Sequence, residues 1–185
     1  TASGALVAIL TLAEIHQLHF INALWLMCVA IFIDSIDGML ARLVNVKEVI
    51  PKIDGALLDN IIDFVNYVIT PCFFLLVAPD LLSSIMKYPV IIVVSLASCY
   101  QFTQSDAKTT DHFFKGFPCY WNLVVLYLYI FSANSLISST VLLVLSTLVF
   151  IPIKYVYPSR LDYLTDVKWL KVLMFIASIL YLLLR

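Results

Sequence analysis

The sequence has little charge, no basic run and no paired cysteines, and these shortages exclude several classes of protein. Only 12% of its 185 residues are charged, whereas 63% are hydrophobic and the mean hydropathy is +1.02. A soluble domain of this length has no interior large enough to bury so many apolar side chains. Without a basic run or stripe, nucleic-acid binding has no support. We therefore expect one all-α membrane domain over residues 1–185, with a lipid bilayer as the solvent for much of its surface.

Cysteine usage gives no sign of a disulfide framework or a metal site. The four cysteines show no CxxC pairing and mostly lie in apolar runs, which predicts small buried hydrophobic side chains. No cleavable signal peptide is visible. The chain begins and ends inside apolar runs, at Thr1 and Arg185, so we expect both termini to be truncated.

Long apolar runs predict a polytopic transmembrane helix bundle of about seven spans. A bilayer core of about 30 Å requires roughly 20 apolar residues per helix. The predicted spans are residues 3–15, 21–42, 56–77, 85–102, 121–132, 138–156 and 167–184. Between the second and third spans, apolar residues recur at helical spacing over residues 43–53 until Pro51 limits the segment. This pattern predicts a short interfacial helix.

Lysine and arginine are distributed unevenly between the two membrane faces. If the connectors after the second, fourth and sixth spans share one side, nine of the 11 lysines and arginines lie there. The positive-inside rule assigns that side to the cytosol. Asp34, Asp37, Asp59 and Asp63 lie at the same face.

Two consecutive spans each present carboxylates and a glycine on one helix face. In the second span, the polar or small positions at offsets 0, 3, 4, 7 and 8 are Asp34, Asp37, Gly38, Ala41 and Arg42. In the third span, Gly55, Asp59 and Asp63 are spaced four apart. These offsets put each set on one face. The small residues leave room for a bulky ligand, such as a nucleotide pyrophosphate, to approach the backbone.

Four clustered carboxylates in a membrane protein need a compensating charge. One aspartate at the centre of a membrane helix costs about 2.5 to 3.5 kcal/mol. Oxygen ligands without a nearby histidine or cysteine favour one or two Mg²⁺ or Mn²⁺ ions over Zn²⁺. Helix caps or solvated interface charges are the alternative, but Asp34 and Asp63 lie about two turns inside their predicted spans.

The two-helix pattern resembles the signature of the CDP-alcohol phosphotransferase family. It reads Asp34-x2-Asp37-Gly38-x2-Ala41-Arg42, then Gly55-x3-Asp59-x3-Asp63. Twelve residues separate Arg42 from Gly55, more than in most of the family, and this longer connector is similar to that of the bacterial phosphatidylcholine synthase branch. The resemblance to that branch extends to three other places: the residues around Asp54, residues 108–118 and Trp121-Asn122.

The resemblance implies a reaction and residue roles. Asp34, Asp37 and Asp59 would be metal ligands and Asp63 the catalytic base, while Gly38, Ala41, Arg42 and Gly55 would line the nucleotide site. The implied reaction is CDP-diacylglycerol plus choline giving phosphatidylcholine plus CMP. The resemblance further implies a homodimer in the bacterial inner membrane, with the active site facing the cytosol.

Choline carries a permanent positive charge, so its recognition calls for aromatic faces. The aromatic candidates on the expected cytosolic side are Tyr67, Tyr100, Phe114, Phe117, Tyr120, Trp121 and Tyr155. For each of them a role in the core or at the membrane interface is the alternative. Lys108 and Lys115, beside Asp106 and Asp111, are candidates for binding the donor phosphate, although the positive-inside rule explains them equally well.

Two other functions remain open from the sequence. The same chemistry with serine or inositol as acceptor would use the same acidic site. A cation-coupled transporter would need acidic residues along the depth of the membrane, and the cores of the fourth to seventh predicted spans contain none.

Overall fold

A computed structural model describes residues 2–43, 52–107 and 113–156, with the backbone alone for 37–43 and 156. In chain order the elements are α1 (Ser3–His16), α2 (Phe20–Leu43), α4 (Gly55–Phe64), the π-helix η1 (Val65–Ile69), α5 (Thr70–Val77), α6 (Lys87–Thr103), β1 (Phe113–Lys115), α7 (Trp121–Ile130), α8 (Ser135–Leu148) and β2 (Lys154–Val156). The mainly helical class is confirmed. The predicted seventh span lies outside the described residues, as does most of the predicted interfacial helix.

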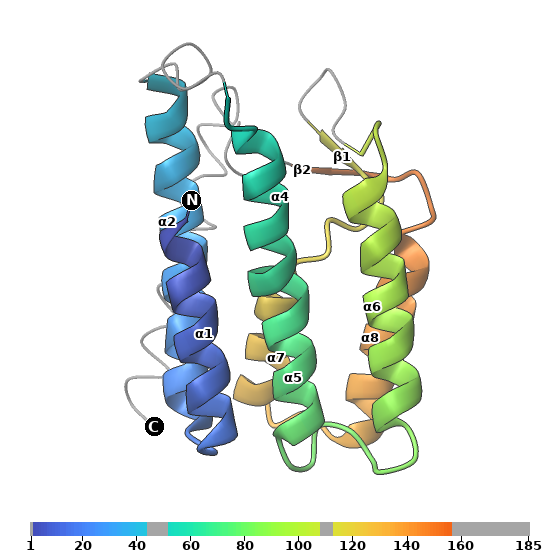
Figure 1. The fold of residues 1–185 in the computed structure, drawn as a ribbon. Coiled ribbons are helices and arrows are strands. Elements are labelled where there is room, and N and C mark those ends of the chain that lie inside the picture. Colours follow the sequence, from blue (N-terminus) through green and yellow to red (C-terminus); the bar gives the residue numbers. More distant parts are fainter. Residues whose placement is uncertain (1, 44–51, 108–112, 157–185) are drawn as a thin grey trace, which may run out of the picture.

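The helices run side by side as a bundle (Figure 1). Helix α1 packs along α2, and α4, η1 and α5 follow one another as a single rod through the middle of the bundle. Helix α5 contacts α1, α6 and α7, while α6 also packs against α8. Strands β1 and β2 lie at the end of the bundle where α2 ends and α4 begins (Figure 1). That end also holds the acidic residues.

Polar side chains mark where two of the helices begin. Asp54 precedes α4 and accepts hydrogen bonds from the backbone N–H groups of Ala56 and Leu57, at 3.1 and 3.0 Å. Asn134 does the same for α8, accepting from the N–H of Ile137 at 2.9 Å. The first N–H groups of a helix have no partner within the helix, so such caps stabilise its start.

The core lies between α5, α6 and α7. Trp121, at the start of α7, is fully buried, and its indole Nε1 donates to Ser98 Oγ on α6 at 2.7 Å. Phe74 of α5 is also fully buried and meets Phe20 and Tyr129 edge-on, with ring centroids 5.3 and 5.6 Å apart. The contacts of Phe74 join α5 to α2 and α7. Because α4 continues through η1 into α5, these contacts also fix the position of α4.

The prediction of seven membrane spans is not confirmed. Within the described ranges, one continuous helical run, Gly55–Val77, is long and apolar enough to cross a membrane. Shorter apolar helical stretches of 10 to 17 residues are Ser3–His16, Phe20–Ile36, Trp121–Ile130 and Ser135–Leu148. A helix such as α7, with 10 residues, reaches only about 15 Å, roughly half of a bilayer core.

The predicted span over residues 138–156 is wrong in its second half. Helix α8 ends at Leu148, and Lys154–Val156 forms β2, which pairs antiparallel with β1. The cause is Pro152, which has no backbone N–H and disfavours the helical conformation of the residue before it. Beyond this proline the chain crosses to β1 and pairs Lys154 with Lys115, a strand contact that the all-α prediction omitted.

Large apolar side chains are exposed along the outer helices. They include Leu6 and Ile9 on α1, Leu96 on α6 and Leu136 on α8, each 61 to 77% exposed. Monomeric soluble proteins rarely expose apolar surface spread over several neighbouring elements. The outward faces of this bundle therefore match what a bilayer would cover.

Candidate metal centre

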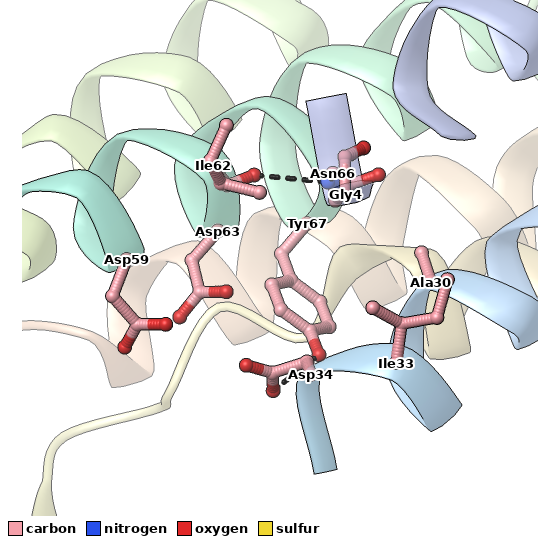
Figure 2. Close-up of a pocket in the computed structure, with 9 residues that line it drawn as sticks. All are labelled: Gly4, Ala30, Ile33, Asp34, Asp59, Ile62, Asp63, Asn66 and Tyr67. Carbon is pink, nitrogen blue, oxygen red and sulfur yellow. Dashed lines mark hydrogen bonds between the residues drawn. The ribbon is translucent and has the colours of Figure 1, made fainter. Parts of the chain in front are cut away.

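Three carboxylates from two helices converge at one end of the bundle. Asp34 lies on α2, and Asp59 and Asp63 lie one turn apart on α4. One carboxylate oxygen from each residue can be chosen so that all three lie within 4.8 Å of one another. Figure 2 shows the three side chains facing a common space, and all three are half-buried. The predicted juxtaposition of the two acidic helix faces is therefore confirmed for these residues.

The carboxylates line a pocket between α1, α2, α4 and η1. Its lining consists of Gly4, Ala30, Ile33, Asp34, Asp59, Ile62, Asp63, Asn66 and Tyr67 (Figure 2). The acids occupy one side of it and apolar side chains of α2 and α4 the other. Such a site can receive a ligand with a charged centre and an apolar part.

Tyr67 makes a direct bond to one of the acids. Its hydroxyl donates to Asp34 Oδ2 at 2.9 Å, and only 5% of the residue is exposed. The tyrosine belongs to η1, so this bond links the middle rod to α2 across the pocket. Its ring meets that of Tyr120 edge-on, with centroids 5.7 Å apart.

Asn66 fixes the start of α1 to the pocket. Its Nδ2 donates to the carbonyl oxygens of Gly4 and Ile62, both at 3.1 Å. Gly4 is required here because a Cβ at this position would lie 2.6 Å from Ile62 Cγ2. Helix α1 can approach α4 this closely only without a side chain at residue 4.

The donor set suits a hard divalent cation. Where side chains are described, Asp34, Asp59 and Asp63 form the group of acidic, histidine or cysteine residues close enough to share an ion. Around an octahedral ion with oxygens at 2.0 to 2.1 Å, neighbouring ligand oxygens lie about 2.9 Å apart and opposite ones about 4.2 Å apart. The three carboxylate oxygens, all within 4.8 Å of one another, can therefore reach one ion once the side chains move inward. All-oxygen coordination favours Mg²⁺ or Mn²⁺ over Zn²⁺.

Comparison with known proteins decides the family. The family model for CDP-alcohol phosphatidyltransferase matches residues 1–152. The chain belongs to this family. It is 56% identical to the phosphatidylcholine synthase of Legionella pneumophila over 181 residues, which cover 98% of this chain and 71% of that protein. It is 57% identical to the phosphatidylcholine synthase of Legionella bozemanae over 177 residues, covering 96% and 82% of the two chains.

More distant relatives agree. The phosphatidylcholine synthase of Borreliella burgdorferi is 39% identical over 160 residues, which cover 86% of this chain and 68% of that protein. As a CDP-alcohol phosphatidyltransferase, the chain is an enzyme of phospholipid synthesis that transfers a phosphatidyl group to an alcohol. The acidic pocket is its candidate active site.

Several predicted residues of this phosphatidyltransferase lie where their side chains are not described. Asp37, Gly38, Ala41 and Arg42 belong to α2 by their backbone, which keeps them on the helix that carries Asp34. Lys108 lies outside the described residues. Gly55 is described at the start of α4, and a Cβ placed on it would meet no atom of the described residues within 4 Å. Among those residues, none fills the space beside Gly55.

Some of the aromatic candidates for choline binding lie at or next to the pocket, and others lie away from it. Tyr67 lines the pocket, and Tyr120 lies between it and Phe114, whose ring centroid is 6.1 Å from that of Tyr120. Trp121 is fully buried in the core, so its ring presents no face to a ligand. Tyr100 does not line the pocket; it is 46% exposed and packs against Phe150.

Lys115 is held by an acid outside the pocket. Its Nζ lies 2.6 Å from Asp106 Oδ2; the Asp106 side chain is largely exposed and that of Lys115 partly exposed. The hydrogen bond from Lys115 holds the pKa of Asp106 below its ordinary value, and the same bond raises the pKa of Lys115. A phosphate bound by Lys115 would have to compete with this carboxylate.

Apart from Tyr67, the sequence prediction missed the pocket residues that carry no charge. Asn66 follows Asp63 by three positions and Asp59 by seven, so it shares their helix face, and this spacing was a usable signal. Gly4, Ala30 and Ile33 carry no comparable signal, since small and apolar residues occur throughout both helices. Their place in the pocket depends on how α1 and α2 pack against α4.

Proposed function

We propose that this phosphatidyltransferase moves the phosphatidyl group of CDP-diacylglycerol to choline, giving phosphatidylcholine and CMP. The observation that carries the proposal is the convergence of Asp34, Asp59 and Asp63 on one pocket. The names of its relatives, phosphatidylcholine synthases at 39 to 57% identity, support choline as the acceptor.

In this proposal Asp34, Asp37 and Asp59 hold one or two Mn²⁺ or Mg²⁺ ions. When bound, the cation supplies charge that stabilises the pyrophosphate and the departing CMP. Without a cation, three half-buried carboxylates would repel one another at the separation described above. Gly38, Ala41, Arg42 and Gly55 bind the nucleotide, and the space beside Gly55, which no described residue fills, supports this assignment.

Asp63 is the proposed base. It accepts the hydroxyl proton of choline as the choline oxygen bonds to the phosphorus of the phosphatidyl group, and the bond from that phosphorus to CMP breaks. Asp63 also has an oxygen within 4.8 Å of the other two acids, so a ligand role is the competing assignment. Asp63→Asn separates the two: a base predicts loss of kcat with Mn²⁺ binding kept, and a ligand predicts loss of both.

The choline site is proposed beside the aromatic row Tyr67–Tyr120–Phe114. A quaternary ammonium cannot donate a hydrogen bond and is recognised by aromatic faces. The row extends from the acidic pocket toward β1, so a choline nitrogen resting on it would keep its hydroxyl near Asp63. Tyr120→Leu is expected to raise the KM for choline more than the KM for CDP-diacylglycerol.

We further propose that the enzyme is a homodimer in the bacterial cytoplasmic membrane, with the pocket facing the cytosol. The exposed apolar faces of α1, α6 and α8 support a bilayer environment. The excess of lysine and arginine that the sequence predicts for the side of the aspartates supports a cytosolic orientation. In this arrangement the fatty chains of the donor remain in the bilayer while the reaction takes place at its surface.

The test is an acceptor assay with purified protein. CDP-diacylglycerol and Mn²⁺ are incubated with choline, serine or inositol in turn, and the labelled phospholipid and CMP are quantified. We expect phosphatidylcholine and CMP in equal amounts with choline, and no product when a chelator removes the cation. Preference for serine or inositol would replace choline as the acceptor, and product formation without a divalent cation would contradict the metal site.

A further inference from the structure

The phenol of Tyr67 is placed to control one of the proposed metal ligands. Its hydroxyl donates to Asp34 Oδ2 at 2.9 Å, while the other carboxylate oxygen of Asp34 points toward the side of the pocket that holds Asp59 and Asp63 (Figure 2). A carboxylate held by a donor on one oxygen has less freedom to rotate, and this restriction presents its second oxygen in one direction.

We propose that Tyr67 is a positioning residue that orients Asp34 for divalent-cation binding. The inference rests on the proposed function, because it assumes that Asp34 ligates the cation. Partners that bond to a metal ligand orient it, and replacing one typically lowers metal affinity by about 10- to 100-fold. Tyr67 has this relation to Asp34, and it reaches the carboxylate from a different helix.

The backbone around Tyr67 is fixed by a local departure from α-helical bonding. Pro71 has no N–H, and in an α-helix its ring would clash with the carbonyl of Tyr67, four residues earlier. The chain widens into η1 instead, where the N–H of Thr70 bonds to the carbonyl of Val65, five residues earlier. The hydroxyl of Thr70 then donates to the carbonyl of Asn66 at 2.7 Å. This widened turn sets the direction of Tyr67.

The side chains on either side of the turn hold Tyr67 further in place. The neighbouring Asn66 is anchored to both Gly4 and Ile62 by its amide, and the Tyr67 ring packs edge-on against Tyr120. The tyrosine is therefore supported on its backbone and on its ring before any ligand arrives. Pre-organised support of this kind is what an effective ligand-orienting residue requires.

An aromatic role in choline binding is the competing explanation for Tyr67, and Tyr67→Phe separates the two. This variant keeps the ring and removes the hydroxyl. If the hydroxyl positions Asp34, Tyr67→Phe weakens Mn²⁺ binding and leaves the KM for choline near the wild-type value. If only the ring matters, Tyr67→Phe changes neither. Tyr129→Phe is the matched control, because its ring packs against Phe20 and Phe74 in the core.

The experiment is a Mn²⁺ titration of the purified full chain in detergent, followed by electron paramagnetic resonance of free Mn²⁺. We expect Tyr67→Phe to raise the Mn²⁺ dissociation constant about 10-fold or more, and Tyr129→Phe to leave it within about twofold of wild type. The Mn²⁺ concentration that Tyr67→Phe needs for half-maximal activity should rise together with its Mn²⁺ dissociation constant.

A double variant shows whether the effect passes through Asp34. In an Asp34→Asn background, adding Tyr67→Phe should change the Mn²⁺ dissociation constant no further, whereas a general structural loss would add to it. The positioning role is refuted if Tyr67→Phe binds Mn²⁺ like wild type while Asp59→Asn does not, and the proposed function survives that result. Absence of Mn²⁺ binding by the wild-type protein would overturn both.

Discussion

Replacing Gly4 with alanine tests how closely α1 approaches the pocket. A Cβ at residue 4 would lie 2.6 Å from Ile62 Cγ2 and 3.4 Å from Asn66 Nδ2. Real Cβ atoms essentially never come within 3.0 Å of another heavy atom, so something must shift. Ile62 is β-branched, and its Cγ2 cannot swing aside without a change of rotamer. The added methyl therefore forces either a new Ile62 rotamer or a shift of α1 away from α4, and both cost packing energy.

The expected cost of Gly4→Ala follows from two opposing effects. Overpacking a close contact costs about 1 to 3 kcal/mol, and the better helix propensity of alanine returns up to about 1 kcal/mol. The net expectation is a loss of about 1 to 2 kcal/mol in the free energy of unfolding. In a chain of this size each kcal/mol shifts the melting temperature by about 2 to 4 °C, so the midpoint should fall by roughly 2 to 8 °C.

The assay is thermal unfolding in detergent, followed by tryptophan fluorescence, with Gly55→Ala as the matched control. Within the described part of the chain, a Cβ added at Gly55 would have no neighbouring atom within 4 Å, so this variant should melt at or above the wild-type temperature. It should nevertheless lose transferase activity if the nucleotide lies beside Gly55, as proposed. A Gly4→Ala variant as stable as wild type would refute the close approach of α1 to α4.

Two further predictions concern the core and the surface. Ser98→Ala leaves the buried indole N–H of Trp121 without its acceptor, so it should lower the free energy of unfolding by about 1 to 3 kcal/mol. Ser146→Ala is the control, because it removes only a hydroxyl that bonds within its own helix. In the same melting assay the control should cost less. The Lys115–Asp106 pair lowers the carboxyl pKa in the folded state, so its contribution to stability is present at neutral pH and lost as the pH falls below about 4. Lys115→Met should remove this acid-dependent component of the melting temperature measured against pH, and an unchanged profile would show that the pair contributes nothing.

Local patterns in the sequence predicted much of the acidic site. Asp59 and Asp63 are four residues apart, so a helix necessarily puts them on one face. The first predicted span, residues 3–15, agrees with α1 (Ser3–His16) to within a residue, because the apolar run and the polar residues after it mark the helix end. Both inferences use only near neighbours in the chain.

The missed features depend on contacts between distant residues. Tyr67 drew attention for its ring, yet its hydroxyl bonds to Asp34, 33 positions away, and no local pattern names that partner. The pairing of β1 with β2 likewise joins segments on either side of α7 and α8. Pro152 did signal the end of α8, but the apolar residues around it made the run look continuous.

Direct titration with Mn²⁺ tests the central claim that the converging carboxylates exist to hold a divalent cation. Isothermal calorimetry on the purified protein should show one or two bound ions. Asp59→Asn should reduce the affinity by more than the roughly 10- to 100-fold expected for an outer residue, and Asp106→Asn, which alters an exposed acid, should bind like wild type. Equal Mn²⁺ binding by the wild-type protein and Asp59→Asn would contradict the account.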